Sequence, residues 1–240
     1  SAMATLDLNE YSASSVKSTS ADACPVITVD HPDTTYFPKI VTIDYGDGCS
    51  LIFNNDTITR KGKIMITVTN RYFVTGAKRI ITFDNFYIND VKVEGTRTIT
   101  NLGLNEKEHL TFSIKLENGK ITFSDDRYVT CESERMREWA RLSDWSKDTL
   151  YITGWVNGTN INGDNYTCEI DEPLVLIHCL VFNRRWTIVD GSLVITIGNE
   201  SPIVIDYGDG TCDRRMEISK DNKSRSVEFH YRHHWRSRKY

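Results

Sequence analysis

The stretch Val41-Thr-Ile-Asp-Tyr-Gly-Asp-Gly-Cys49 returns later in the chain as Val204-Ile-Asp-Tyr-Gly-Asp-Gly-Thr-Cys212. The six residues Ile-Asp-Tyr-Gly-Asp-Gly are identical in the two copies, which begin at Ile43 and Ile205. In each copy a β-branched run enters a pair of glycines. Asp beside Gly favours a tight turn, because both residues tolerate positive φ. Each copy therefore predicts a β-strand that ends in a tight turn.

The two turns also carry four aspartates whose oxygens are the kind of ligand that calcium prefers: Asp44, Asp47, Asp206 and Asp209. These acids do not follow the alternate spacing of an EF-hand loop. A structural turn is thus the favoured interpretation, and a calcium site is the alternative. We expect no other cofactor, because no residue pattern in the chain indicates one.

A cysteine follows each turn, and each of these has a candidate partner upstream. The order of cysteine, strand, turn and cysteine is the same in both places, which predicts two disulfides: Cys24–Cys49 and Cys179–Cys212. Cys131 and Cys168 then form a third pair or remain free thiols. No C-x-x-C motif occurs, which argues against a zinc ribbon or a thioredoxin-type centre. Bridged cysteines favour an oxidising compartment, so we expect an extracytoplasmic protein.

Charge and hydropathy exclude other classes of protein. The formal net charge of −4 offers no global attraction to nucleic acid or to an anionic membrane. No apolar run is long enough to span a bilayer as a helix. Residues 1–23 begin with a Ser-Ala-Met cloning remnant and continue as a flexible tether rich in Ser, Thr and Ala, which we expect to follow a removed lipid anchor.

Between residues 24 and 232, short alternating strands follow one another at intervals of about ten residues with turn signals between them. This pattern predicts a mainly β fold: a large antiparallel meander, as an open curled sheet, a sandwich or a barrel-like form, with at most one or two short helices. The domain is a single unit or two related halves around the two turns, and residues 233–240 form a basic tail.

Two stretches within this domain carry specific predictions. Asn118-Gly119 predicts a hairpin between His109–Leu116 and Lys120–Phe123. Cys131–Leu142 favours a helix, because its residues are good helix formers and Met136, Trp139 and Leu142 are three apart. The alternative for Cys131–Leu142 is a strand whose alternating Glu and Arg pair with opposite charges on neighbouring strands.

The chain resembles a group of secreted lipoproteins from Bacteroidetes-type bacteria, over most of residues 24–215. The resemblance implies export and lipid anchoring, at the outer-membrane surface or in the periplasm, and no particular substrate. Besides the repeated stretch, it is carried by Arg60–Ile64, Phe83–Tyr87, Val93–Arg97, Thr100–Gly103 and Ser133–Trp139.

No nucleophile elbow, phosphate-binding loop, dinucleotide fingerprint or H-E-x-x-H motif is present. Two acid pairs, Asp125-Asp126 and Asp171-Glu172, are the candidates for glycosidase chemistry, which needs two carboxyl groups facing each other across a cleft. Trp155 precedes a polar turn, so Trp155, Asn157 and Asn165 are candidate ligand-binding residues, with Trp155 as a stacking surface for a sugar.

These features favour an exported, lipid-anchored, non-enzymatic β protein that binds a partner or ligand, a glycan or a lipid, at the cell envelope. One alternative is a carrier in which a curled sheet holds a lipid or another apolar ligand. A carbohydrate-active protein is the other alternative. We expect no nucleic-acid partner.

Overall fold

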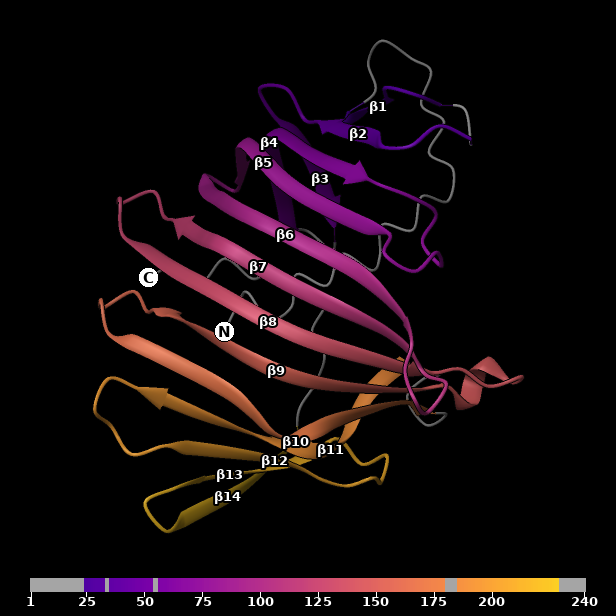
Figure 1. The fold of residues 1–240 in the computed structure, drawn as a ribbon. Helices are drawn as coiled ribbons and strands as arrows, with labels where there is room; N and C mark the ends of the chain where they lie inside the picture. Colours follow the sequence, from indigo (N-terminus) through magenta and orange to yellow (C-terminus); the bar gives the residue numbers. More distant parts are fainter. Residues whose placement is uncertain (1–23, 33–34, 54–55, 180–184, 229–240) are drawn as a thin grey trace.

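A computed structural model describes residues 24–32, 35–53, 56–179 and 185–228. The expected tether (1–23) and basic tail (233–240) lie outside these residues. The described chain forms one open antiparallel sheet of 14 strands that curls from β1 at one edge to β14 at the other (Figure 1). Its helical content is the 3₁₀ turn η2 (Trp145–Lys147). The predicted mainly β meander is therefore confirmed, in its open form.

The strands lie side by side in sequence order, except that β3 shares one side of β4 with β2. Their bounds are β1 (Val26–Val29), β2 (Lys39–Asp44), β3 (Cys49–Phe53), β4 (Asp56–Val68), β5 (Lys78–Ile88), β6 (Val91–Leu104), β7 (Leu110–Thr122), β8 (Tyr128–Ala140), β9 (Thr149–Thr159), β10 (Asn165–Cys179), β11 (Arg185–Ile197), β12 (Ile203–Asp209), β13 (Arg215–Lys220) and β14 (Lys223–Glu228).

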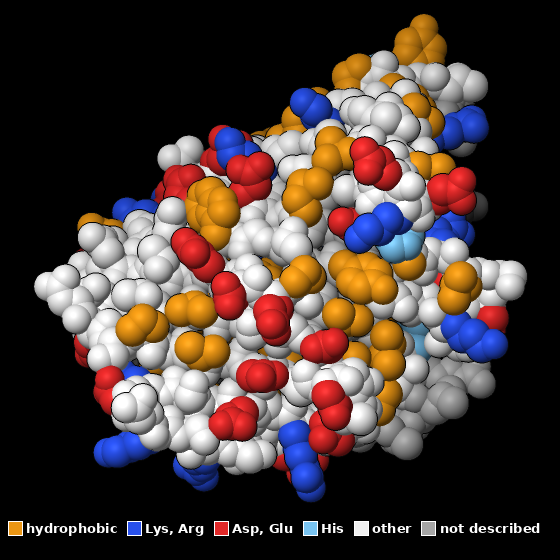
Figure 2. Space-filling model, turned by 60° about the horizontal axis from the view of Figure 1, so that its bottom comes forward, with side chains coloured by type: hydrophobic (Ala, Val, Ile, Leu, Met, Phe, Trp, Pro, Cys, Tyr) orange, Lys and Arg blue, Asp and Glu red, His pale blue; other side chains and the backbone are white. Residues whose placement is uncertain are grey.

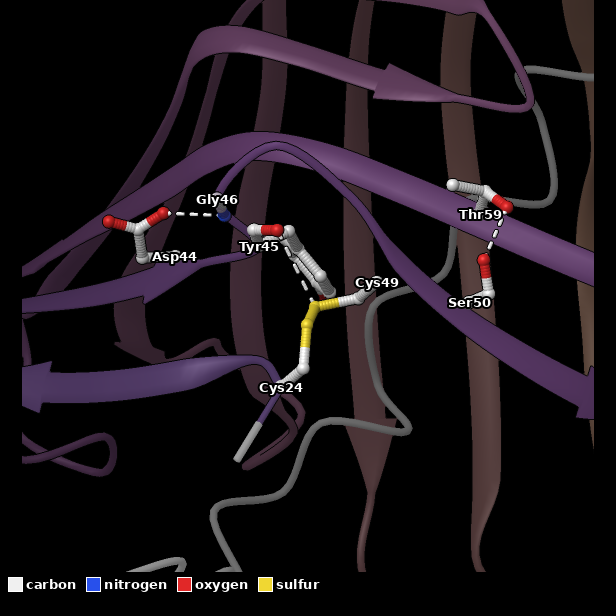
Figure 3. Close-up of a disulfide and its surroundings, with 7 residues drawn as sticks. All are labelled: Cys24, Asp44, Tyr45, Gly46, Cys49, Ser50 and Thr59. Carbon is white, nitrogen blue, oxygen red and sulfur yellow. Dashed lines mark hydrogen bonds between the residues drawn. A yellow bond between two sulfur atoms is a disulfide. The ribbon is translucent and has the colours of Figure 1, made fainter. Parts of the chain in front are cut away.

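The predicted strand that ends in a tight turn is confirmed in the first copy, where β2 ends at Asp44, and is wrong in the second copy, where β12 continues to Asp209. In the first copy, β2 and β3 pair antiparallel with successive parts of β4. The turn between them therefore interrupts a single line of strand beside β4 and does not reverse the chain. The Asp44 carboxylate accepts a hydrogen bond from Gly46 N at 2.8 Å (Figure 3). In the second copy the corresponding Asp206 accepts one from Gly208 N at 2.8 Å, within β12. The repeat is thus a repeated Asx turn that bends a strand.

Both predicted disulfides are confirmed. Cys24–Cys49 joins the segment before β1 to the start of β3, with the Cα atoms 5.7 Å apart (Figure 3). Cys179–Cys212 joins the end of β10 to the loop after β12, with a Cα separation of 5.8 Å. Each bridge is buried on one side: Cys49 packs in a cluster with Ile43, Tyr45, Ile64, Ile81, Phe86 and Val93, and Cys179 is fully buried. The bridges therefore secure regions near the two edges of the sheet.

The predicted hairpin at Asn118-Gly119 is wrong, because both residues lie inside β7. The register with β8 shifts between Leu116 and Gly119, which makes this position a β-bulge. A Cβ added to Gly95 in β6 would lie 2.9 Å from Gly119 Cα, so the two backbones approach too closely for side chains. Asp190-Gly191, another pair of a turn-favouring residue with glycine, is likewise a bulge within β11. Bulges bend strands and increase their twist, which curls the sheet.

The helix favoured for Cys131–Leu142 is also wrong, since Tyr128–Ala140 is strand β8. The alternative of a strand is confirmed, but its charge pairing holds only in part: Glu134 lies opposite Lys115 of β7, whereas Arg135 lies opposite Ile114 and Gly154. Helix propensity is a weak preference, and the ladders that β8 forms with β7 and β9 outweigh it.

The sheet has two chemically different faces. Side chains alternate along each strand, and residues directly opposite one another share a face. We call the face that carries Ile43, Ile64, Ile81, Val93 and Phe112 the inner face, because these side chains are buried. The opposite side is the outer face. The polar residues that alternate with the apolar ones in β4, such as Lys63 and Thr67, lie on the outer face.

If close backbone approach at the bulges fixes the curl, Gly191→Ala will destabilise the protein more than Gly210→Ala. The two glycines have nearly the same φ, +96° and +94°. Each substitution then costs about 1–2 kcal/mol for the left-handed backbone. The Cβ at position 191 would also overlap Pro173 O, whereas nothing lies within 4 Å of the Cβ at position 210. Overlap adds about 1–3 kcal/mol. Urea unfolding of the two variants measures the difference, and equal stabilities would contradict this account.

Candidate functional site

The four candidate calcium ligands do not form one site. Asp44 is the last residue of β2 and Asp47 lies in the turn after it, whereas Asp206 and Asp209 lie in β12, toward the other edge of the sheet. The backbone N–H of Gly46 and the ammonium of Lys63, 3.0 Å from Asp44, lower the pKa of the Asp44 carboxyl. Among the described residues, no three His, Cys, Asp or Glu side chains are grouped as a metal site.

The structure brings Trp155, Asn157 and Asn165 to one side of the β9–β10 hairpin, on the outer face. Asn157 lies opposite Thr167, and Asn165 lies opposite Thr159. The Trp155 indole is 38% exposed, and the carboxylates of Glu134 and Glu169 flank it on the neighbouring strands. This is an exposed aromatic surface with acids beside it.

The two candidate acid pairs lie elsewhere. Asp125 sits in the β7–β8 turn, where its carboxylate binds Arg127 with Oδ2 2.7 Å from Nη2. Asp171-Glu172 is exposed in the irregular part of β10.

Cys131 and Cys168 are free thiols on the inner face, so the third disulfide does not form. Cys131 lies on β8 and Cys168 on β10, with β9 between them. Gly158 of β9 lies opposite Tyr166, whose hydroxyl donates to Thr130 O at 3.2 Å. Burial raises the pKa of both thiols, and burial also raises the pKa of the Tyr166 hydroxyl. Both cysteines are therefore protonated at neutral pH.

Apart from its arginines, the inner face is a succession of apolar rows that run across the strands. One row of directly opposed residues crosses nine strands, and most of its members are half-buried: Ile66, Ile81, Arg97, Leu116, Ser133, Val156, Cys168, Ile195 and Ile203. The described residues provide no second layer of secondary structure over this face. An apolar surface of this extent on one side of a curled sheet is typical of a ligand-binding surface.

Within β5–β8, four arginines interrupt the apolar rows, one on β5, one on β6 and two on β8. Arg79 and Arg135 share a row with Ile99 and Ile114 between them. Arg97 lies one row away, between Ile81 and Leu116. The fourth, Arg137, is opposite Phe112 and Ile152 and is only 8% exposed.

The connection between β4 and β5 folds over the inner face and fixes two of these arginines. The Tyr72 ring stacks on Phe112 with the ring centroids 4.9 Å apart. Arg79 lies over the Tyr72 ring at 4.6 Å, and Arg137 Nη2 donates to the Tyr72 hydroxyl at 2.8 Å. Asn101 Nδ2 donates to Tyr72 O at 2.8 Å, which anchors the connection to β6. Cation–π contact and stacking therefore hold the guanidinium groups in place.

Carboxylates are segregated on the other face. Along β5–β9, each strand Asp or Glu whose register is described lies on the outer face: Asp84, Glu94, Glu117, Glu132, Glu134 and Glu138. Among the described residues, no ion pair involves Arg79, Arg135 or Arg137. In the space-filling view, acidic side chains spread over the visible surface while basic ones lie mainly toward its margin (Figure 2).

A groove of about 580 Å³ opens at one end of the inner face. Its floor includes Leu110 and Trp139, which are inner-face residues opposite each other. Phe73, Leu104 and Leu142, all more than half exposed, form its sides. The buried Asp148 carboxylate accepts hydrogen bonds from Trp139 Nε1 and from Leu142 N, at 2.9 and 2.8 Å, and so shapes the wall.

No protein-family model matches the chain, and neither a curated protein nor a solved structure matches it. None of the helical segments that the structure describes has the length and apolar character to cross a bilayer.

Sequence reasoning missed Arg135 and Arg137 because it favoured a helix for Cys131–Leu142. The alternation of residue types in that stretch indicates a strand. The odd-numbered positions include Ser133, Arg135, Arg137 and Trp139, whereas the even-numbered positions include Glu132, Glu134 and Glu138. If the stretch is a strand, successive side chains point to opposite faces, so this sequence predicts one basic face and one acidic face.

Alkylation tests the state of the thiols. In urea without reductant we expect iodoacetamide to label Cys131 and Cys168 and none of the bridged cysteines. In the native protein at pH 8 the raised thiol pKa and the burial slow labelling by about tenfold or more. Mass spectrometry of time points reports both results. Labelling of all six cysteines in urea, or native labelling at the unfolded rate, would contradict the assignment.

Proposed function

We propose that the protein is an exported carrier that holds the apolar part of a ligand against the inner face of its curled sheet. The observation that carries this proposal is the set of half-buried apolar rows on one face, with a groove of about 580 Å³ leading to them. Apolar contact is roughly proportional to the area removed from water, so a long chain laid across several strands would gain affinity at each row.

Export is supported by the two disulfides, which form and persist in oxidising compartments. The further elements of the proposal are a lipid anchor and a place at the cell envelope, in the periplasm or at the outer-membrane surface. They rest on the resemblance to secreted lipoproteins. A carrier tethered to a membrane would exchange its ligand with that membrane through the groove end, where Phe73, Leu104 and Leu142 are exposed.

A pair of valines on opposite faces tests the site. Val156 lies on the inner face and Val194 on the outer face, and both are half-buried strand residues. Burying a polar amide beside an apolar chain is unfavourable, so we expect Val156→Gln to weaken the binding of the neutral probe N-phenylnaphthylamine about tenfold. Fluorescence titration measures this change. Val194→Gln is the matched control. The proposal would be overturned if the probe did not bind the wild-type protein, or if it bound the two variants with equal affinity.

A second candidate is glycan binding on the outer face, favoured by the exposed Trp155 indole between Glu134 and Glu169. Sugar rings stack on indole faces, so Trp155→Ala is expected to abolish any retardation in polysaccharide affinity gels. The exposed Trp145, outside this surface, supplies the control as Trp145→Ala. Equal migration of the wild-type protein with and without polysaccharide would exclude this candidate for the glycans tested.

A further inference from the structure

The arginines are the one feature of the inner face that an apolar ligand does not explain. We propose that Arg79 and Arg135 bind the anionic head group of an amphiphile whose apolar chain lies along the neighbouring rows. This inference rests on the proposed carrier function and names the chemical class of its ligand: a carboxylate or phosphate carried on an acyl or alkyl chain.

The placement of charge supports an anion. Arg79 and Arg135 project into apolar rows, and no described carboxylate pairs with them, while the strand acids of β5–β9 lie behind the sheet. A charge in apolar surroundings is costly unless it is paired and hydrogen-bonded. An anionic group on the inner face supplies that partner, whereas a cationic group would meet like charge.

Neighbouring groups prepare the site for a planar or tetrahedral anion. Guanidinium groups bind carboxylate and phosphate in two-pronged fashion, which ammonium groups do not. Tyr72 holds Arg79 by a cation–π contact of 4.6 Å, so little side-chain freedom is lost when an anion binds.

Apolar rows on both sides of the arginines favour an amphiphile over a free anion. Leu116 and Val156 lie one row to one side of Arg135, and Ile152 and Leu174 lie one row to the other. Successive residues on one face of a strand are about 7 Å apart. A head group over Arg135 therefore places the first carbons of its chain on apolar side chains in either direction.

The experiment compares ligands with one chain and different head groups. Isothermal titration calorimetry below the critical micelle concentration measures binding of dodecanoate, dodecyl phosphate and dodecyl maltoside to the full chain. We expect the two anionic ligands to bind about tenfold or more tightly than the neutral maltoside, since charge-assisted hydrogen bonds are the strong ones. Arg79→Gln and Arg135→Gln should each remove most of that preference and leave maltoside binding unchanged.

Two further variants separate charge at this site from charge in general. Arg135→Lys keeps the positive charge but loses the planar guanidinium that binds an anion through two hydrogen bonds. This variant should retain part of the preference for anionic ligands. Lys115→Gln removes a cation from the outer face, where Lys115 pairs with Glu117 at 3.0 Å, and should change nothing. Circular dichroism confirms that each variant is folded.

The outcomes distinguish the two proposals. Equal affinity for anionic and neutral ligands, or a preference that survives both glutamine variants, overturns the head-group assignment alone. Failure of all three ligands to bind overturns the carrier function itself. A preference for dodecanoate or for dodecyl phosphate identifies which anion the arginines fit, a fatty-acid carboxylate or a phospholipid-type phosphate.

Discussion

A single layer of strands that has to cover its own apolar face is the constraint on which the rest of this structure depends. Most β domains pack a second sheet or a helix against that face, and the described residues of this chain contain neither. Curling the sheet, folding the β4–β5 connection over it and bridging both edges with disulfides bury only part of the surface. Among the described residues, the apolar rows are therefore only partly covered.

Local sequence predicted the strands well and their connections less well, for one physical reason. Glycine next to Asn or Asp permits positive φ, and both a hairpin turn and a β-bulge use that freedom. Asn162-Gly163-Asp164 does connect β9 to β10, whereas Asn118-Gly119 bends β7 without ending it. Which outcome occurs depends on whether a neighbouring strand, here β6 and β8, continues past the glycine, and that information lies far away in the sequence.

The disulfides were predictable because the repeated stretch set the two cysteine pairs in equivalent surroundings, which reduced the alternatives. The candidate site was not, because it consists of residues such as Arg79 and Arg135 that are distant in the chain and meet only through strand register. Trp155 was correctly picked out as a projecting residue, but it projects from the face opposite the arginines.

The alternation of Arg and Glu in β8 links the fold to the proposed function. In a helix these charges would have neutralised one another along the surface. In a strand they are forced to opposite sides, so Arg135 and Arg137 enter the inner face while Glu134 and Glu138 remain on the outer one. The outer acids keep a wide sheet surface hydrated, and among the described residues no carboxylate pairs with Arg135 or Arg137. One sequence pattern thereby places acidic side chains on the outer face and Arg135 and Arg137 on the inner face, where the proposed anionic head group would lie.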